Sequence, residues 1–341
     1  MKKIKVAQIG TGHDHATASW QTINRLTDIF EVVGYAFPEN DTEQYERTKA
    51  AYEGGKLLDM EELLAMRDLD AVLIETNELE STRFAQLAAD RGWHVQLDKP
   101  GGESAEEFET LCRTLKSRGL VLNMGYMYRY NPEVLRLYER IGRGELGEIL
   151  SVETHMDCEH PTWKRAWLGQ FRGGMMFFLG CHLLDLIYRI RGMPTEIINL
   201  NSASRMEGTT SLDQGFCVLR YPNGMSFAHT FADEPAGFMR RQLVVTGTKG
   251  TAVLQPLEAY TENGLQITGV REATPGKGWC YDGERRTSEP FDRYEAMIKA
   301  FASFIRGEAV NPYTYEYECT LHRIVLAASG IDVDYHAPIT L

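Results

Sequence analysis

Three features that would place this sequence in other protein classes are missing. No apolar run approaches the roughly 20 residues of a membrane span, and Met-Lys-Lys at the N-terminus leads directly into a strand-like segment instead of the apolar core of a signal peptide. The six cysteines form neither a CxxC pair nor a short metal-type spacing. We therefore expect a soluble, cytoplasmic protein with reduced thiols, no membrane partner and no bound metal.

Basic residues are scarce relative to acidic ones. The chain has 36 Lys and Arg against 48 Asp and Glu, a formal net charge of −12, so most of its surface would repel the phosphates of a nucleic acid. Its 341 residues suffice for about two domains of about 150 residues each. The composition favours a two-domain enzyme for a small molecule and excludes nucleic acid as an expected partner.

The first third of the chain alternates strand-like apolar runs with helical patterns. Strands joined by helices imply a parallel sheet, because a tight hairpin cannot join parallel neighbours. We therefore assign residues 1–123 to a doubly wound α/β domain, a Rossmann domain. Its strands are predicted at Ile4–Ile9, Val32–Ala36, Ala71–Glu75, His94–Leu97 and Leu120–Asn123.

Residues 124–341 have longer strands separated by hairpin turns such as Pro222-Asn223-Gly224. They predict an α+β domain with a mostly antiparallel open sheet flanked by helices, and its C-terminal helices are candidates to pack back on the first domain. Thr274–Pro290 is rich in Gly and Pro and is predicted to be irregular. Strands are predicted at Ile149–Asp157, Ile197–Ser204, Gln214–Tyr221, Met225–Asp233, Gln242–Thr246 and Thr251–Gln255, and helices at Pro132–Ile141, Cys181–Arg191, Tyr294–Arg306 and Tyr317–Val333.

The strongest local motif is the glycine turn that follows the first strand. Gly10 permits a tight turn, and Gly12 lets backbone amides approach a pyrophosphate at a helix N-terminus, so Gly10, Thr11, Gly12 and His13 are candidate cofactor contacts. The third position of the fingerprint holds His15 instead of Gly or Ala. The alternative is an ordinary β-α turn in a fold that has lost its cofactor.

The end of the second strand lacks the acidic residue that normally binds the adenosine ribose. Phe37 stands there, and Glu39 follows as a possible substitute. No arginine lies close behind the strand to bind a 2′-phosphate, since Arg47 is distant. This favours NAD over NADP as the cofactor and leaves NADP open.

Several motifs follow one another in an order and spacing that resemble the glucose-fructose oxidoreductase, inositol dehydrogenase and MocA (Gfo/Idh/MocA) family. The likeness extends over nearly the whole chain. The motifs are Asp98-Lys99-Pro100, Gly125-Tyr-Met-Tyr-Arg129-Tyr-Asn131-Pro132, Gly144-Glu-Leu-Gly147-Glu-Ile and Gly173-Gly174-Met-Met-Phe-Phe178-Leu-Gly180-Cys-His182-Leu-Leu-Asp185.

The resemblance implies that Lys99 lies between nicotinamide and substrate and that His182 takes the proton of the substrate hydroxyl while hydride leaves the same carbon. A lysine and an imidazole suit these roles because their pKa values can be tuned toward neutral pH. The alternatives are a surface lysine and a histidine that caps or packs a helix. Thr76, Asp98, Pro100 and Arg129 are the remaining candidate cofactor contacts.

Two positions depart from the family pattern. Phe178 stands where dehydrogenases of the family usually carry an aspartate, and a phenylalanine cannot move a proton or hydrogen-bond a sugar. Glu75-Thr76-Asn77-Glu78 replaces the usual (A/S)TPN segment. With His15 and Phe37, these changes indicate a divergent subgroup.

Replacement polar groups lie nearby in the sequence. His155 and Asp157 alternate along one predicted strand and so share a face, where they are expected to supply polar contacts that Phe178 cannot; a solvated polar face is the alternative. His155, Asp157, His160 and His182 are also metal-ligand types, but their spacing fits no standard site. The candidate substrate contacts are Tyr126, His155, Asp157, Trp163, Lys164 and Asp185, of which Asp185 can instead orient His182 or bind backbone amides.

The leading functional hypothesis is an NAD(P)-dependent dehydrogenase that acts on a secondary hydroxyl of a sugar, inositol or related polyol. One alternative keeps the nucleotide tightly bound and recycles it in an elimination, glycoside cleavage or epimerisation. Another is a non-catalytic ligand sensor. An open sheet face predicts a homodimer or homotetramer.

Overall fold

The computed structural model describes residues 2–235 and 237–341, and the chain forms two compact units. The first comprises the residues up to Tyr126 with 294–322 and 337–341, and the second comprises 127–293 and 323–336. The predicted boundary between residues 123 and 124 lies near this division. The segment 294–322 belongs to the first unit.

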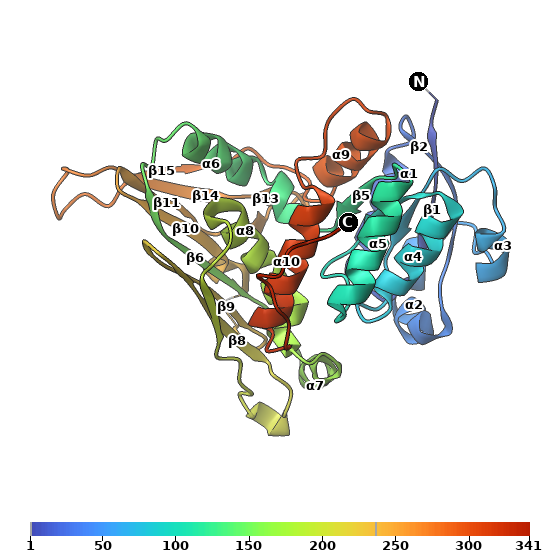
Figure 1. Ribbon diagram of the computed structural model, residues 1–341, viewed down its shortest axis with the longest axis horizontal. Coiled ribbons are helices and arrows are strands. Elements are labelled where there is room, and N and C mark those ends of the chain that lie inside the picture. The colour runs from blue at the N-terminus through green and yellow to red at the C-terminus, as the bar shows by residue number, and fades with distance from the viewer. Residues whose placement is uncertain (1, 236) are drawn as a thin grey trace. The chain divides into compact units, whose positions relative to one another are not determined.

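The first unit contains a five-stranded parallel sheet in the order β2-β1-β3-β4-β5 (Figure 1). Residues of the central strands are almost fully buried, as expected for strands covered on both faces. This confirms the predicted Rossmann-like sheet. The strands are β1 (Ile4–Ile9), β2 (Phe30–Ala36), β3 (Ala71–Ile74), β4 (His94–Leu97) and β5 (Leu122–Met124).

Helices pack on both faces of this sheet, with α4 against α5 and α1 against α9. In α5, Ser104 caps the N-terminus by accepting a hydrogen bond from the Glu107 amide, and Phe108, Leu111, Cys112 and Leu115 form its buried stripe. The helices are α1 (Ala16–Arg25), α2 (Thr42–Thr48), α3 (Met60–Leu64), α4 (Ser81–Arg91), α5 (Ala105–Ser117), α9 (Glu295–Ile305) and the first part of α10 (Tyr315–Ala328).

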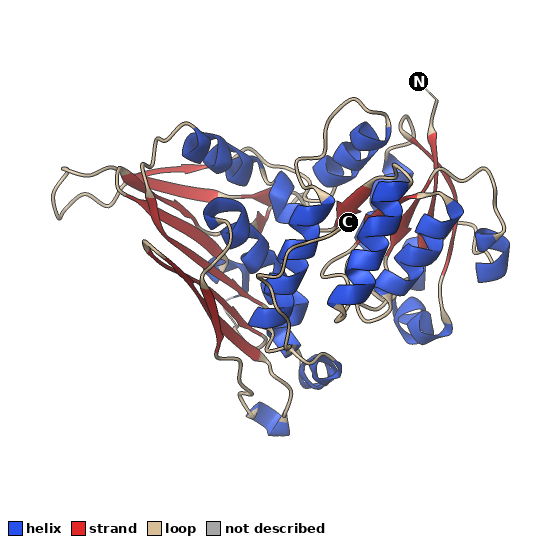
Figure 2. Ribbon diagram, in the orientation of Figure 1, coloured by secondary structure: helices blue, strands red, loops and turns tan. Residues whose placement is uncertain are grey.

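The second unit contains an eight-stranded sheet in the order β15-β14-β11-β10-β6-β9-β8-β7. Figure 2 shows the strands in red and the helices in blue. Neighbours are antiparallel except β6 and β9, which run parallel, so the sheet is mostly antiparallel as predicted. β12 (Ala259–Tyr260) and β13 (Gln266–Ile267) form a small separate sheet. The large sheet consists of β6 (Ile149–Asp157), β7 (Glu196–Asn199), β8 (Gln214–Tyr221), β9 (Gly224–Phe231), β10 (Gln242–Gly247), β11 (Gly250–Leu254), β14 (Gly269–Ala273) and β15 (Glu284–Thr287).

Helix α8 packs on β6 and β9, where Val152 and Met156 of β6 are fully buried. The π-helical segment η5 runs directly into α8. α6 begins with Pro132 at its first position, and the Asn131 side chain caps it by accepting from the Glu133 amide. The helices are α6 (Pro132–Gly142), α7 (Thr162–Trp167), η5 (Met176–Gly180) and α8 (Cys181–Arg191).

Two sequence-based predictions of local structure are corrected. Thr274–Pro290 is not wholly irregular, because β15 lies within it and pairs with β14. The helix predicted to extend to Val333 ends at Ala328, close to Gly330, which has a φ of +80° that other residues rarely adopt. Across residues 2–235 and 237–341, no helix combines the length and apolarity needed to cross a membrane.

Candidate functional site

The glycine turn after β1 packs tightly on the end of β3. Gly10 has a φ of +98°, and a Cβ atom there would lie 2.3 Å from the Thr76 amide nitrogen. The His13 amide donates to the Glu75 carbonyl oxygen at 3.0 Å. Only glycine therefore allows this approach, which fixes the turn at the carboxyl ends of the parallel strands, where ligands bind in such sheets.

Two backbone amides of this turn bind the carboxylate of an acidic side chain. The Asp41 carboxylate, in the short 3₁₀ helix η1 (Glu39–Asp41), accepts hydrogen bonds from the Thr11 amide at 2.8 Å and the Gly12 amide at 2.9 Å. A Cβ atom at Gly12 would lie 2.3 Å from Asp41 Oδ1. Burial raises the pKa of Asp41 to about 6, against the opposing effect of these amides. We call the Thr11 and Gly12 amides the cradle; their predicted contact with a cofactor pyrophosphate stays a prediction.

Sequence reasoning missed Asp41, because it looked for an acid at the end of β2 itself. Phe37, at that point, stacks on Tyr45 with ring centroids 4.5 Å apart, and Glu39 is exposed. The acidic residues shortly after the strand were the available signal. Only the folded turn shows which of them reaches the amides.

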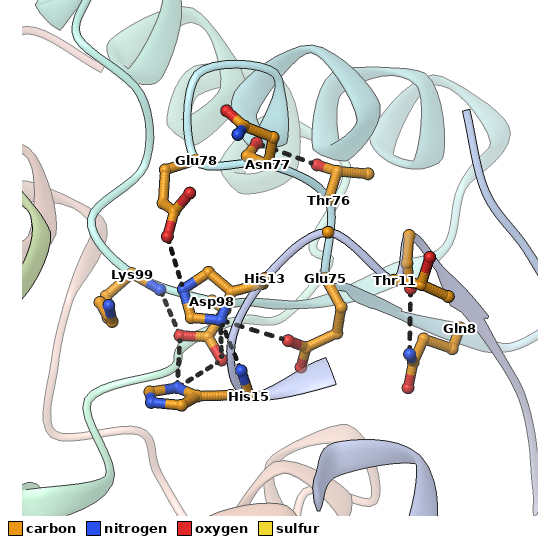
Figure 3. Close-up of polar contacts among 12 residues, drawn as sticks. Gln8, Thr11, His13, His15, Glu75, Thr76, Asn77, Glu78, Asp98 and Lys99 are labelled. Atoms are coloured by element: carbon orange, nitrogen blue, oxygen red, sulfur yellow. Dashed lines mark hydrogen bonds and ion pairs between the residues drawn. The ribbon is translucent and has the colours of Figure 1, made fainter. Parts of the chain in front are cut away.

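Two histidines and three carboxylates gather beside this cradle (Figure 3). We call His13, His15, Glu75, Glu78 and Asp98 the histidine–carboxylate cluster. Asp98 Oδ2 lies 3.5 Å from His13 Nδ1 and 3.1 Å from His15 Nδ1, and all of the cluster except His15 is buried. Burial, and then the charge of Asp98, raises the pKa of Glu75 well above its usual range. The (A/S)TPN departure thus places acids next to the glycine turn.

Lys99 follows β4 directly and is only 1% exposed. Its backbone amide donates to Asp98 Oδ1 at 2.7 Å, and its peptide bond to Pro100 is cis. Thr76 and Tyr126 are also buried in this unit. The alternative of a surface lysine is therefore wrong, and Lys99 occupies the sheet edge that carries the glycine turn.

His182 is buried in the first turn of α8 in the second unit. The Tyr128 ring lies perpendicular to its imidazole, with centroids 5.2 Å apart. The Tyr128 hydroxyl hydrogen-bonds the Glu258 carboxylate and accepts from Arg241 Nη1 at 3.1 Å. Sequence reasoning missed Tyr128, Arg241 and Glu258, because no motif links residues so far apart in the chain.

Phe178, the second departure, lies in η5 within an aromatic group. Its ring is nearly parallel to Phe171 and perpendicular to Trp167, with centroids 6.0 and 5.4 Å away. Lys164 Nζ lies 3.5 Å from the Trp167 centroid and 4.9 Å from that of Phe178. Trp163, by contrast, is 56% exposed. Phe178 therefore contacts aromatic rings and lies near the Lys164 ammonium group.

Comparison with known proteins places both units in one family. Residues 4–126 match the oxidoreductase family with an NAD-binding Rossmann fold, and residues 134–253 match the GFO/IDH/MocA C-terminal domain. The chain belongs to the Gfo/Idh/MocA oxidoreductase family. The resemblance stated from the motifs is confirmed.

Individual relatives in this family are distant. The uncharacterized oxidoreductase YdgJ of Escherichia coli is 27% identical over 264 residues, which cover 72% of this chain and 73% of the relative. D-xylose 1-dehydrogenase (NADP⁺) 2 of Haloferax volcanii is 27% identical over 71% of both chains. Among solved structures, the 3-ketoreductase KijD10 of Actinomadura kijaniata, in complex with NADP, superposes with a TM-score of 0.75 at 16% identity, covering 95% of this chain and 96% of its own. That likeness shows the shared fold.

In this Gfo/Idh/MocA protein, Arg129 and Asp185 face each other. Arg129 Nη2 donates to Asp185 Oδ1 at 2.8 Å and Nε donates to Oδ2 at 3.0 Å, with both side chains almost fully buried. Such a bidentate pair fixes η3 (Met127–Tyr130) to α8 within the second unit. The predicted cofactor role of Arg129 and substrate role of Asp185 stay predictions.

His155 and Asp157 lie on the face of β6 opposite to α8. The strand alternates, with Val152, Thr154 and Met156 buried on the helix-covered face. His155 contacts Asp157 and stacks edge-on against His229 of β9, 4.4 Å away. The sheet therefore separates them from His182. Their predicted role as polar substrate contacts in place of Phe178 stays a prediction.

Proposed function

We propose that this chain is an NAD(P)-dependent dehydrogenase that transfers hydride between a nicotinamide cofactor and a secondary hydroxyl of a sugar, inositol or related polyol. The observation that carries the proposal is the pair of Thr11 and Gly12 amides binding an anion in the same unit as the buried Lys99. Relatives named as sugar and inositol dehydrogenases support the substrate class.

The cradle suits the phosphates of a dinucleotide. A carboxylate oxygen and a phosphate oxygen are both anionic acceptors, so the Thr11 and Gly12 amides that now hold Asp41 would hold the pyrophosphate once the Asp41 side chain moves aside. The bound nicotinamide supplies the hydride acceptor. NAD is the favoured form because Arg47, the nearest arginine after β2, is exposed and pairs with Glu43; relatives named for NADP make it the form to compare.

The hydroxyl proton is assigned to two residues. Lys99 would hydrogen-bond the reacting hydroxyl. His182 accepts the proton, since an imidazole has a pKa close to the working pH. Phe178 contributes no proton transfer and presents an apolar surface, which suits the C–H face of a sugar ring.

The test is turnover by purified protein with NAD or NADP and a panel of aldoses, inositols and polyols, followed by the absorbance of the reduced nicotinamide. Lys99→Met should abolish turnover and leave nucleotide binding measurable by calorimetry. Lys56→Met, at an exposed lysine of the same unit, is the matched control. Absence of nucleotide binding, or full turnover by the Lys99→Met variant, would contradict the proposal.

The second candidate function is a redox-neutral reaction on a nucleotide that stays bound. Phe178 favours it, because an apolar side chain leaves the proton transfers of a simple dehydrogenase without the family's aspartate. Nucleotide that co-purifies, with no net absorbance change while product forms, would select this candidate over the first.

The open face of the eight-stranded sheet is proposed to bind a second copy of the chain. Phe216, Phe227 and His229 contribute partly exposed rings to that face. Light scattering of the purified protein, which should report a dimer or tetramer, tests this part of the proposal.

A further inference from the structure

The histidine–carboxylate cluster contains a set of metal-ligand atoms that have no part in the proposed hydride and proton transfers. His13, His15 and Asp98 each offer one nitrogen or oxygen atom, and these atoms all lie within 4.8 Å of one another. In the described ranges 2–235 and 237–341, this is the one such group of three histidine, cysteine or acidic side chains. Its ligands come from the glycine turn and from the end of β4, two segments far apart in the sequence.

The distances between these atoms match the edges of a small coordination polyhedron. A four-coordinate Zn²⁺ with bonds of about 2.0–2.2 Å sets its ligand atoms about 3.3–3.6 Å apart. His13 Nδ1 and His15 Nδ1 lie 3.5 and 3.1 Å from Asp98 Oδ2. Glu75 Oε2 lies 3.7 Å from His13 Nδ1, which makes it the nearest candidate for the fourth position. His13, His15 and Asp98 thus form the core of the site, and Glu75 would have to move toward them to complete it.

The hydrogen bonds of His13 give it the tautomer that a metal ligand requires. Its Nδ1 accepts from the His15 amide at 3.1 Å and so carries no proton; because this nitrogen has one lone pair, a bound ion would replace that hydrogen bond. The ring proton is then on Nε2, which faces Glu78 Oε1 at 3.5 Å (Figure 3). A histidine that directs its second nitrogen at a carboxylate is the usual arrangement around bound metals, because the carboxylate orients the ring and raises its basicity.

The backbone holds the ligands in place. The Lys99 amide fixes Asp98 through Oδ1, so Oδ2 faces both imidazoles. The His13 amide is bound to the Glu75 carbonyl, which ties the turn to β3. Two imidazoles with carboxylates suit Zn²⁺ and similar transition ions, whereas Ca²⁺ and Mg²⁺ prefer all-oxygen sites.

We propose that His13, His15 and Asp98 bind one divalent transition-metal ion of the Zn²⁺ class, with Glu75 completing the coordination and Glu78 supporting His13. The ion also offsets the negative charge of three carboxylates that lie beside one another with little exposure. The expectation of no bound metal, drawn from cysteine spacing and from the His155 region, did not consider these residues together. This proposal is independent of the proposed dehydrogenase activity, since a metal can bind whether or not turnover occurs.

The test is metal binding by the full chain after treatment with a chelator. Calorimetry with Zn²⁺ should report one ion per chain, and Co²⁺ should give the visible absorption bands of a low-coordinate site, which Zn²⁺ then removes. His15→Ala and Asp98→Asn should weaken Zn²⁺ binding at least about 100-fold, and Glu78→Gln should weaken it by about 10- to 100-fold. His336→Ala, which removes an exposed histidine elsewhere, should leave the affinity unchanged.

The Co²⁺ spectrum keeps the test valid if a variant folds poorly, because it is recorded on the unaltered chain. Far-ultraviolet circular dichroism checks the fold of each variant. Absence of Co²⁺ bands in the unaltered chain would overturn the proposal. So would Zn²⁺ affinity in folded His15→Ala and Asp98→Asn variants equal to that of the His336→Ala control.

Discussion

The two units bury their charges in different ways. In the second unit, the buried arginines Arg129, Arg165 and Arg241 each lie within salt-bridge distance of a carboxylate. In the first unit, four buried acids, Asp41, Glu75, Glu78 and Asp98, lie around the glycine turn. Lys99 is that unit's one buried lysine or arginine among the described residues.

This difference in pairing distinguishes buried charges that stabilise the fold from buried charges that can attract a ligand. A buried ion pair with good geometry satisfies both partners and leaves little to attract a third group. An excess of one sign is costly unless protons, a cation or movement of a side chain relieves it. The excess of acids at the strand ends of the first unit is therefore consistent with our proposals of ligand binding there, whereas the ion pairs of the second unit stabilise the structure around His182.

The largest expected effect comes from breaking a pair in the second unit. Arg129→Met leaves the Asp185 carboxylate buried without its bidentate donor, and we expect the free energy of unfolding to fall by about 3–5 kcal/mol. Urea denaturation measures the loss. Arg220→Met, at an exposed pair with Glu196, is the control and should cost less than about 1 kcal/mol. Equal losses in both variants would show that the Arg129 pair is not structural.

The next prediction concerns the acid in the cradle. Asp41→Asn removes the anion that competes with a dinucleotide for the Thr11 and Gly12 amides, so NAD should bind about 10-fold more tightly at pH 8. Calorimetry on both proteins measures the ratio. Asp59→Asn alters an acid that caps α3, outside the cradle, and should leave NAD affinity unchanged. Weaker NAD binding by Asp41→Asn would mean that Asp41 supports the cofactor instead of competing with it.

A smaller change in NAD affinity is expected from a change of pH, because protonation of Asp41 has only part of the effect of the Asp41→Asn substitution. With a pKa of about 6, Asp41 is neutral at lower pH and leaves the amides to a phosphate; above that value its carboxylate competes. NAD affinity should therefore decrease as pH rises through about 6. NAD is used because its pyrophosphate does not titrate in this range. The same pH series on Asp41→Asn should be flatter, and an equal slope would assign the effect to other groups.

Sequence periodicity was sufficient to predict most of the fold. β1, β4, β6, β8 and α8 have the bounds expected from their apolar patterns, since local propensity and burial act in the same direction there. The parallel pairing of β6 with β9 was not predictable, because the hairpin turns specify only neighbours in the chain. β15 was missed because its residues, Glu284–Thr287, are polar and lie at a sheet edge.

Of the candidate site, only the residues that stand in short sequence motifs were predictable. Gly10 and Lys99 stand in short motifs that are visible in the sequence, although the close approach that requires glycine at position 10 involves the distant Thr76. Asp41 and Tyr128 act through contacts with residues distant in the chain, Gly12 and Glu258, and no spacing encodes those contacts. The position of His155 and His182 on opposite sides of the sheet likewise depends on which face α8 covers.

The smallest expected effect concerns Lys164, a buried cation of the second unit. Its ammonium group lies over an aromatic ring. Lys164→Met removes a cation–π contact with Trp167 and keeps most of the apolar volume, so unfolding should become easier by about 1 kcal/mol. Lys277→Met is the control, because that ammonium lies 5.9 Å from the Tyr281 ring in an exposed segment. If Lys164→Met leaves stability unchanged but weakens substrate binding, the Lys164 ammonium group serves ligand binding, as we propose for the buried charges of the first unit. The role of a buried charge would then depend on whether it contacts the substrate and not on which unit contains it.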